Sequence, residues 1–147
     1  MTTNHSSDAE QLPLISEFLG LVAATAPTGR LSLDDVESRS FMKFWRHLII
    51  FRHEPTLQDF RVSFFGTEVV KCYGEDWSGR LLSDSGFTLG FDKIYRVNRE
   101  VMESQEIVSE SGVLDWLERD YVKWHQVKLP LSRAGEITDV LTIICFE

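Results

Sequence analysis

The sequence predicts an α+β protein in which an antiparallel five-stranded sheet carries helices on one face and is preceded by an N-terminal amphipathic helix. Two observations lead to this class. Short apolar runs with alternating polar residues, as in strands, occupy residues 47–64 and return from residue 106 onward. Apolar residues at helical spacing fill the region between them and the region before residue 30. Strands that follow one another in a chain tend to pair, so we expect one antiparallel sheet.

Three segments are expected along the chain. Residues 1–10 are polar and are predicted to form a mobile tail. Residues 11–30 are predicted to form the amphipathic helix and a linker, and residues 31–147 the domain that contains the sheet. The apolar face of the N-terminal helix consists of Leu14, Phe18, Leu21 and Val22.

The first half of the domain is predicted to contain two helices and a hairpin. Residues 33–45 are expected to be helical, since two aspartates suit a first turn and apolar residues follow. Strands are predicted at residues 47–51 and 60–64, with Pro55 at the reversal between them. Thr67 is expected to cap a brief helix that Gly74 ends by adopting a positive φ angle.

The second half is predicted to contain one longer helix and three strands. The helix begins near Phe91, and its apolar face is formed by Ile94, Tyr95, Val101 and Met102. Strands follow at residues 106–111, 121–131 and 137–146, with a hairpin turn at Gly135. The charged residues 115–120 are expected to form an exposed tip between the first two of these strands.

The last strand is apolar on both of its alternating faces, so both sides of the sheet centre are expected to be covered. The N-terminal helix is the available cover for the second side. It is predicted to pack on the sheet of its own subunit or on that of a second subunit, which would give a homodimer. The sequence leaves these two arrangements open.

The composition limits the size and the partners of the protein. The chain has 147 residues, of which 43% are hydrophobic, so one domain can bury a sizeable core. The net charge of -8 disfavours nucleic acid as a partner, because nucleic-acid binding needs a clustered basic surface. Apolar stretches are shorter than a membrane span, and the N-terminus lacks the basic region of a secretory signal. We therefore expect a cytoplasmic protein without membrane insertion.

Residues typical of catalytic or metal sites are present but do not form a known motif. Cys72 and Cys145 lack the spacing of a zinc site and are interpreted as small apolar residues. His47 and His53 lack carboxylates at metal-site spacing. We therefore assign neither a catalytic residue nor a metal ligand.

Several glycines occur in the stretch after the second predicted strand. The stretch begins with Gly66-Thr67 and ends with a Gly-x-Asp-x-x-Gly pattern formed by Gly74, Asp76 and Gly79. A phosphate-binding loop would need a Lys-Ser or Lys-Thr pair here, so the glycines are interpreted as structural. Together with Pro130 near the final hairpin and the order of the elements, this pattern resembles a divergent bacterial family of PAS-like proteins. The resemblance covers about residues 31–146, so it makes the domain at residues 31–147 PAS-like.

The resemblance implies a sensory or interaction module, which holds a small molecule between the sheet and the long helix or pairs with a signalling protein. Haem is disfavoured because the long helix has no histidine, and flavin because Cys72 lacks an Asn-Cys-Arg context. The cofactor, if any, stays unknown. The residues expected to line a ligand pocket are Phe64, Tyr95, Asn98, Val127 and Thr142.

Two other functions stay open. One is a small α+β enzyme with an enclosed pocket, in which His125 and a carboxylate such as Glu110 act as acid and base. The other is a scaffold without a ligand. Acid and base groups that converge in an open pocket would favour the enzyme, whereas dispersed polar groups would favour the interaction module.

Overall fold

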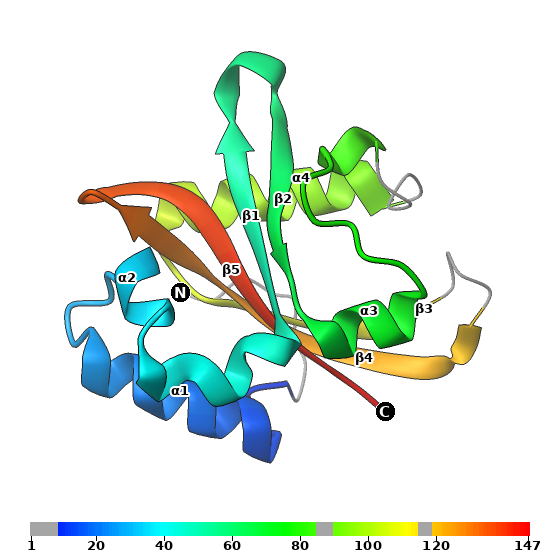
Figure 1. Ribbon diagram of the computed structural model, residues 1–147, viewed down its shortest axis with the longest axis horizontal. Coiled ribbons are helices and arrows are strands. Elements are labelled where there is room, and N and C mark those ends of the chain that lie inside the picture. The colour runs from blue at the N-terminus through cyan, green and yellow to red at the C-terminus, as the bar shows by residue number, and fades with distance from the viewer. Residues whose placement is uncertain (1–8, 85–89, 115–118) are drawn as a thin grey trace.

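Five antiparallel strands form one open sheet in the computed structural model, which describes residues 9–84, 90–114 and 119–147 (Figure 1). Their spatial order is β2-β1-β5-β4-β3. The first and the last strand of the chain therefore lie side by side inside the sheet. The strands are β1 (Leu48–Glu54), β2 (Asp59–Phe65), β3 (Val108–Leu114), β4 (Arg119–Arg133) and β5 (Glu136–Phe146).

Helices cover both faces of this sheet, and the expected α+β class is confirmed. The α4 face carries the long helix α4 (Phe91–Ser104) and the short helix α3 (Thr67–Tyr73). The α1 face carries α1 (Pro13–Thr25), α2 (Leu33–Val36) and the 3-10 segment η2 (Arg39–His47). Shorter 3-10 turns are η1 (Ala9–Gln11), η3 (Pro55–Leu57) and η4 (Leu82–Asp84).

Alternate residues of β5 belong to two separate apolar cores, so the strand is buried on both sides. Val140 and Ile144 pack on the α4 face, where Val97 and Val101 of α4 meet them. Leu141 and Ile143, which alternate with them, pack on the α1 face. The expectation that both faces of the last strand are covered is therefore confirmed.

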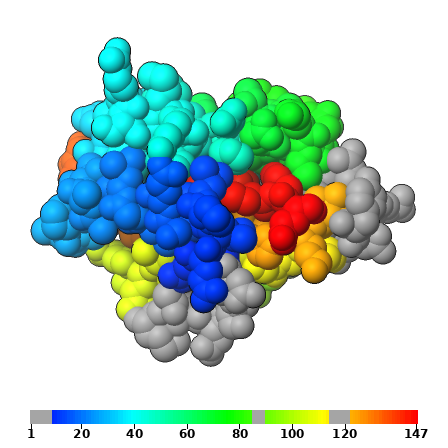
Figure 2. Space-filling view, turned by 90° about the horizontal axis from the view of Figure 1, so that it is seen from below, coloured from blue at the N-terminus to red at the C-terminus, as the bar shows by residue number. Residues whose placement is uncertain are grey.

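The N-terminal helix α1 covers the second face within its own chain. Phe18 is fully buried and makes edge-to-face contacts with Phe41 and Phe44, at ring-centroid distances of 5.9 and 5.2 Å. Val22 is also buried, while Leu14 and Leu21 are half-buried beside the same core. Figure 2 shows this side of the molecule, with the blue N-terminal segment beside the red end of β5 and the cyan segment of η2 above it.

The boundary of the expected tail is wrong at its last two residues. Residues 1–8 lie outside the described part of the chain. Ala9, however, is fully buried in η1, and Glu10 accepts a hydrogen bond from the Ser109 hydroxyl of β3. Ala9 therefore belongs to the core on the α1 face.

Two short elements replace the single helix expected at residues 33–45. Ser32 and Asp35 form a reciprocal capping box, with bonds of 3.0 and 3.1 Å, that starts α2. The indole of Trp45 donates a 2.7 Å bond to the carbonyl of Val36, which ties η2 back to the end of α2. The cap expected at Thr67 is also wrong, since Gly66 is the N-cap of α3 and no side chain caps it.

Leu31 and Ser32 extend the sheet beside β4. The ladder between β3 and β4 starts at the pair Val108 and Lys128, so β3 does not reach the far end of β4. There, Ser132 donates its backbone N–H over 2.9 Å and its hydroxyl over 3.2 Å to the carbonyl of Leu31. The linker after α1 thus occupies the strand edge that β3 leaves open.

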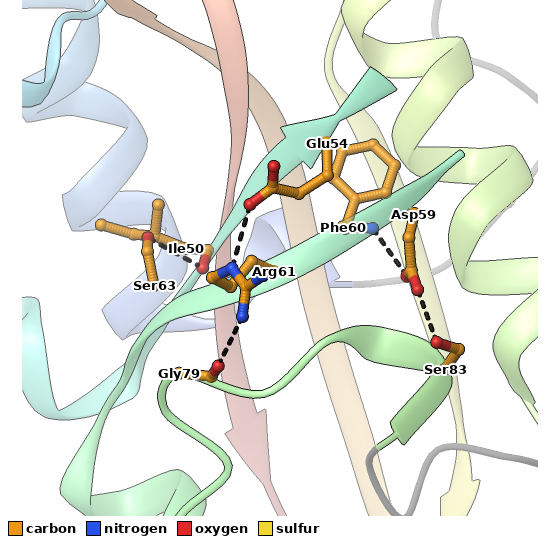
Figure 3. Close-up of polar contacts among 8 residues, drawn as sticks. All are labelled: Ile50, Glu54, Asp59, Phe60, Arg61, Ser63, Gly79 and Ser83. Atoms are coloured by element: carbon orange, nitrogen blue, oxygen red, sulfur yellow. Dashed lines mark hydrogen bonds and ion pairs between the residues drawn. The ribbon is translucent and has the colours of Figure 1, made fainter. Parts of the chain in front are cut away.

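The glycine-rich segment docks along β2, at the edge of the sheet (Figure 3). Gly74 (φ 92°) ends α3 as expected, and Gly79 (φ 85°) turns the chain back toward β2. Gly79 donates to the carbonyl of Val62 over 2.7 Å, and the Arg61 guanidinium bridges the Gly79 carbonyl and Glu54, with bonds of 2.9 Å each.

Other members of the expected signature also have local structural roles. The Asp76 carboxylate accepts bonds from the backbone and hydroxyl of Ser78, and these bonds lower its pKa. Pro130 is buried in β4, opposite Val140 of β5. Gly66 lies against η2, where an added Cβ would come within 2.4 Å of the Arg46 carbonyl oxygen.

Candidate functional site

A pocket of about 400 Å³ lies on the α4 face, between α4 and the strands β3 and β4. Apolar and aromatic side chains form much of its wall, and they include Ile49, Phe51, Tyr73, Ile94 and Trp124. The polar side chains that reach the wall include Lys93, Glu110, Gln126 and Lys128. We call this cavity the α4 pocket.

The strand register brings the polar groups of the α4 pocket together. Glu110 of β3 lies directly opposite Gln126 of β4, whose amide donates a 2.8 Å bond to the Glu110 carboxylate. Side chains alternate along a strand, so Trp124, Gln126 and Lys128 point to the same face. Lys93 approaches from α4, with its Nζ 3.6 Å from Glu110 Oε2.

Gly112 makes room for the aromatic wall. It pairs with Trp124 across the two strands, and an added Cβ would lie 2.6 Å from the indole ring. The indole can therefore lie across β3, where its N–H donates a 3.1 Å bond to the carbonyl of Val113.

Lys128 is the buried basic group of the pocket. Only 2% of its surface is exposed, and its Nζ donates to Asn98 Oδ1 over 2.9 Å and to Thr142 Oγ1 over 3.2 Å. The ammonium also lies 4.7 Å from the centroid of the Phe51 ring. Burial lowers the pKa of Lys128 to about 8, although the nearby charge of Glu110 acts in the opposite direction.

The structure brings together two of the five residues expected to line a ligand site. Asn98 of α4 and Thr142 of β5 are both fully buried and hold the Lys128 ammonium. Tyr95 lies on α4 but packs between Phe60 and Phe91, at ring-centroid distances of 5.6 and 6.0 Å.

The other two expected residues, Phe64 and Val127, lie on the α1 face. Val127 occupies the α1 face because side chains alternate along β4, and its neighbours Gln126 and Lys128 point to the α4 face. Phe64 would share a face with Val62 in a regular strand, but the register of β2 against β1 shifts between these two residues. This irregularity turns Phe64 toward the α1 face while Val62 stays on the α4 face.

Sequence reasoning missed Lys128, Gln126, Trp124 and Tyr73 as pocket residues. A signal for two of them is present in β4, because its polar residues Gln126 and Lys128 alternate with apolar ones in a strand that is paired on both sides. A lysine in the interior of a sheet covered by helices needs polar partners, so it points to a polar site.

His125 does not pair with Glu110, the carboxylate that served as the example for an acid–base pair in the sequence analysis. The two residues project to opposite faces, because His125 lies opposite Ser111 while Glu110 lies opposite Gln126. His125 instead contacts the Ser111 hydroxyl through Nδ1 (2.7 Å) and the carboxylate of Glu147 through Nε2 (2.5 Å).

Residues 9–84, 90–114 and 119–147 contain no cluster of three or more metal-ligating side chains. In the same ranges, no helix is long and apolar enough to cross a membrane. The two cysteines in this part, Cys72 and Cys145, are half-buried, and burial raises the pKa of Cys145 to about 11. Comparison with protein-family models gives no match, and comparison with curated proteins finds no similar sequence.

Proposed function

We propose that the protein is a non-enzymatic, PAS-like sensory module that binds a small molecule in the α4 pocket and passes the change to another protein. The order of elements supports the proposal. β1 and β2 come first, α3 and α4 follow, and β3 to β5 come last, which is the order on which the resemblance to PAS domains rests. The pocket also lies between the sheet and the long helix, where this resemblance implies a ligand.

The observation that carries the proposal is the composition of the α4 pocket. Small-molecule sites are typically concave and apolar, with a few polar groups that fix the orientation of the ligand. The α4 pocket has this composition, since aromatic and aliphatic walls surround the side chains of Glu110, Gln126 and Lys128. Lys128 also contacts α4 through Asn98, so a ligand at Lys128 would act directly on the helix.

The signal is proposed to leave through protein contacts, with a second copy of the chain as the partner. Met42 is 50% exposed, and it lines a shallow depression with the half-buried side chains of Trp45 and Phe64. These apolar side chains lie near the end of β2, an edge strand of the sheet. Exposed apolar groups of this kind favour association between proteins.

Native mass spectrometry of the purified protein tests both parts of the proposal. The expected result is a dimer with an additional mass that is lost on denaturation. Ile94→Trp, which fills the α4 pocket from α4, should remove the additional mass. Arg96→Trp is the matched control, because Arg96 is an exposed residue of the same helix and does not line this pocket.

The outcomes separate the ligand from the partner. A wild-type protein that carries no additional mass, or an additional mass that Ile94→Trp keeps, would contradict ligand binding in the α4 pocket. A monomer would contradict the homodimer. If a dimer forms, Met42→Glu should dissociate it, and a dimer unaffected by this charge would exclude the depression beside β2 as its interface.

A further inference from the structure

The buried ammonium of Lys128 forms no direct ion pair among the described residues, although the charge of Glu110 acts on it from nearby. Its two hydrogen-bond acceptors, Asn98 and Thr142, are neutral, and it forms no ion pair with a carboxylate of the described chain. The ring of Phe51 attracts the cation but does not neutralise it. A buried charge without a directly paired counter-charge is costly, so the site favours an anion that can reach it.

The ammonium keeps one hydrogen-bond donor for such an anion. A lysine ammonium has three N–H groups, and the bonds to Asn98 and Thr142 use two of them. Lys128 lines the α4 pocket, so the third donor can be reached from inside the cavity.

The other charged groups of the pocket wall balance each other. Glu110 is bonded to Gln126 and lies 3.6 Å from the Nζ of Lys93, so its charge is already compensated. The described wall therefore has one net positive charge when Lys128 is protonated, although the whole chain has a net charge of -8. A single negative charge on the ligand would complement it.

We propose that the α4 pocket binds a small monoanion with an apolar ring or chain, whose anionic group pairs with the ammonium of Lys128. The apolar body lies against the wall formed by Ile94, Phe51 and Trp124. The inference rests on the proposed ligand-binding function of this pocket and adds the chemical class of the ligand.

A matched pair of compounds tests the charge of the ligand. 2-Naphthoate and 2-naphthamide have nearly the same shape, but only the first carries a negative charge near pH 7. Their binding to the full-length protein is measured by isothermal titration calorimetry. Because truncating one partner of a buried charge pair costs a few kcal/mol, 2-naphthoate should bind Lys128→Met about thirtyfold more weakly than wild type. 2-Naphthamide should bind both proteins alike.

Lys123→Met is the control variant, because Lys123 is an exposed lysine of the same strand. It should leave the binding of both compounds unchanged. Equal affinities of the wild type for the two compounds, or an equal loss of affinity for both in Lys128→Met, would contradict the proposal that the ligand is an anion. Such a result would still support the pocket as a ligand site. Failure of the wild type to bind either compound would contradict the pocket as a ligand site, and the inference with it.

A pH titration of the wild type keeps the test valid if Lys128→Met does not fold. The charged groups that face the ammonium are Glu110 on β3 and Lys93 on α4. Affinity for 2-naphthoate should fall as pH rises above about 8, because Lys128 loses its charge there, while the affinity for 2-naphthamide stays constant. If Lys93→Met shows the same fall in affinity with pH, the fall is assigned to the loss of charge on Lys128. A constant affinity for 2-naphthoate would overturn the inference.

Discussion

Lys128 donates a 2.9 Å hydrogen bond to Asn98, which joins an interior strand of the sheet to the buried side of α4. Both side chains are almost completely buried. A change in the charge of Lys128 therefore alters its interactions with both the helix and the sheet. This contact provides the first prediction, on the pH dependence of stability.

Lys128 should make the protein more stable as pH rises from about 8 to 10.5. The unfolded chain has the ordinary lysine pKa of 10.5, whereas burial lowers the folded-state pKa to about 8. Between these values the unfolded state binds more protons, so this contribution to stability rises with pH. Wild type should gain about 3 kcal/mol relative to Lys128→Met over this window.

Urea denaturation at a series of pH values measures this difference. Burial raises the pKa of Tyr73 and of Cys145, and both groups destabilise the fold at high pH in either protein. For that reason the readout is the difference between the two proteins. Lys123→Met should show no such trend, and parallel curves for wild type and Lys128→Met would contradict the prediction.

Arg133→Met should destabilise the protein by about 2 to 4 kcal/mol, because it leaves a buried carboxylate without its cation. Asp139 is fully buried and receives two bonds from the Arg133 guanidinium, of 2.9 and 3.0 Å. Chemical denaturation checks the loss. The double variant Arg133→Met/Asp139→Leu should recover part of it, since no charge then stays buried, and a larger loss in the double variant would be evidence against this account.

Gly66→Ala should cost more than about 2 kcal/mol, because the new Cβ would clash with backbone atoms. The Arg46 and Trp45 carbonyl oxygens would lie 2.4 and 2.5 Å away, and backbone cannot move as easily as a side chain. Gly20 in α1 is the matched control, with nothing within 4 Å of its added Cβ. Gly20→Ala should raise stability by up to about 1 kcal/mol. Similar melting temperatures for the two variants would rule out the clash.

Phe18→Ala should destabilise the protein by about 3 to 5 kcal/mol, as expected for removal of a fully buried aromatic ring. It would also weaken the attachment of α1 to the sheet, through the lost contacts with Phe41 and Phe44. Hydrogen exchange of this variant, compared with that of the wild type, should become faster in α1 and change less in α4. An unchanged exchange rate in α1 would mean that this ring does not hold the helix in place.

Local signals were sufficient to predict most elements of the fold. The apolar run of β5 and the turn at Gly135 (φ 86°) predicted the last hairpin, because alternation and turn chemistry act over a few residues. The helical spacing from Phe91 likewise predicted α4, which extends to Ser104.

Which face a residue occupies was harder to predict. The register shift in β2 moves Phe64 to the α1 face, and no sequence signal marked it. Pocket residues such as Glu110 and Gln126 meet only through the pairing of β3 with β4, which is set by contacts distant in sequence. The predicted site therefore contained Asn98 and Thr142, which are the hydrogen-bond partners of Lys128, but it did not contain the lysine itself.

The position of Leu31 against Ser132 bears on the solubility of the protein. An open strand edge offers unpaired backbone groups to which another chain can add a strand, and this is a common route to aggregation. The linker between α1 and α2 satisfies such groups at the end of β4 that β3 does not reach. It therefore protects this end of β4 against pairing with a second molecule, in addition to connecting α1 to the rest of the fold.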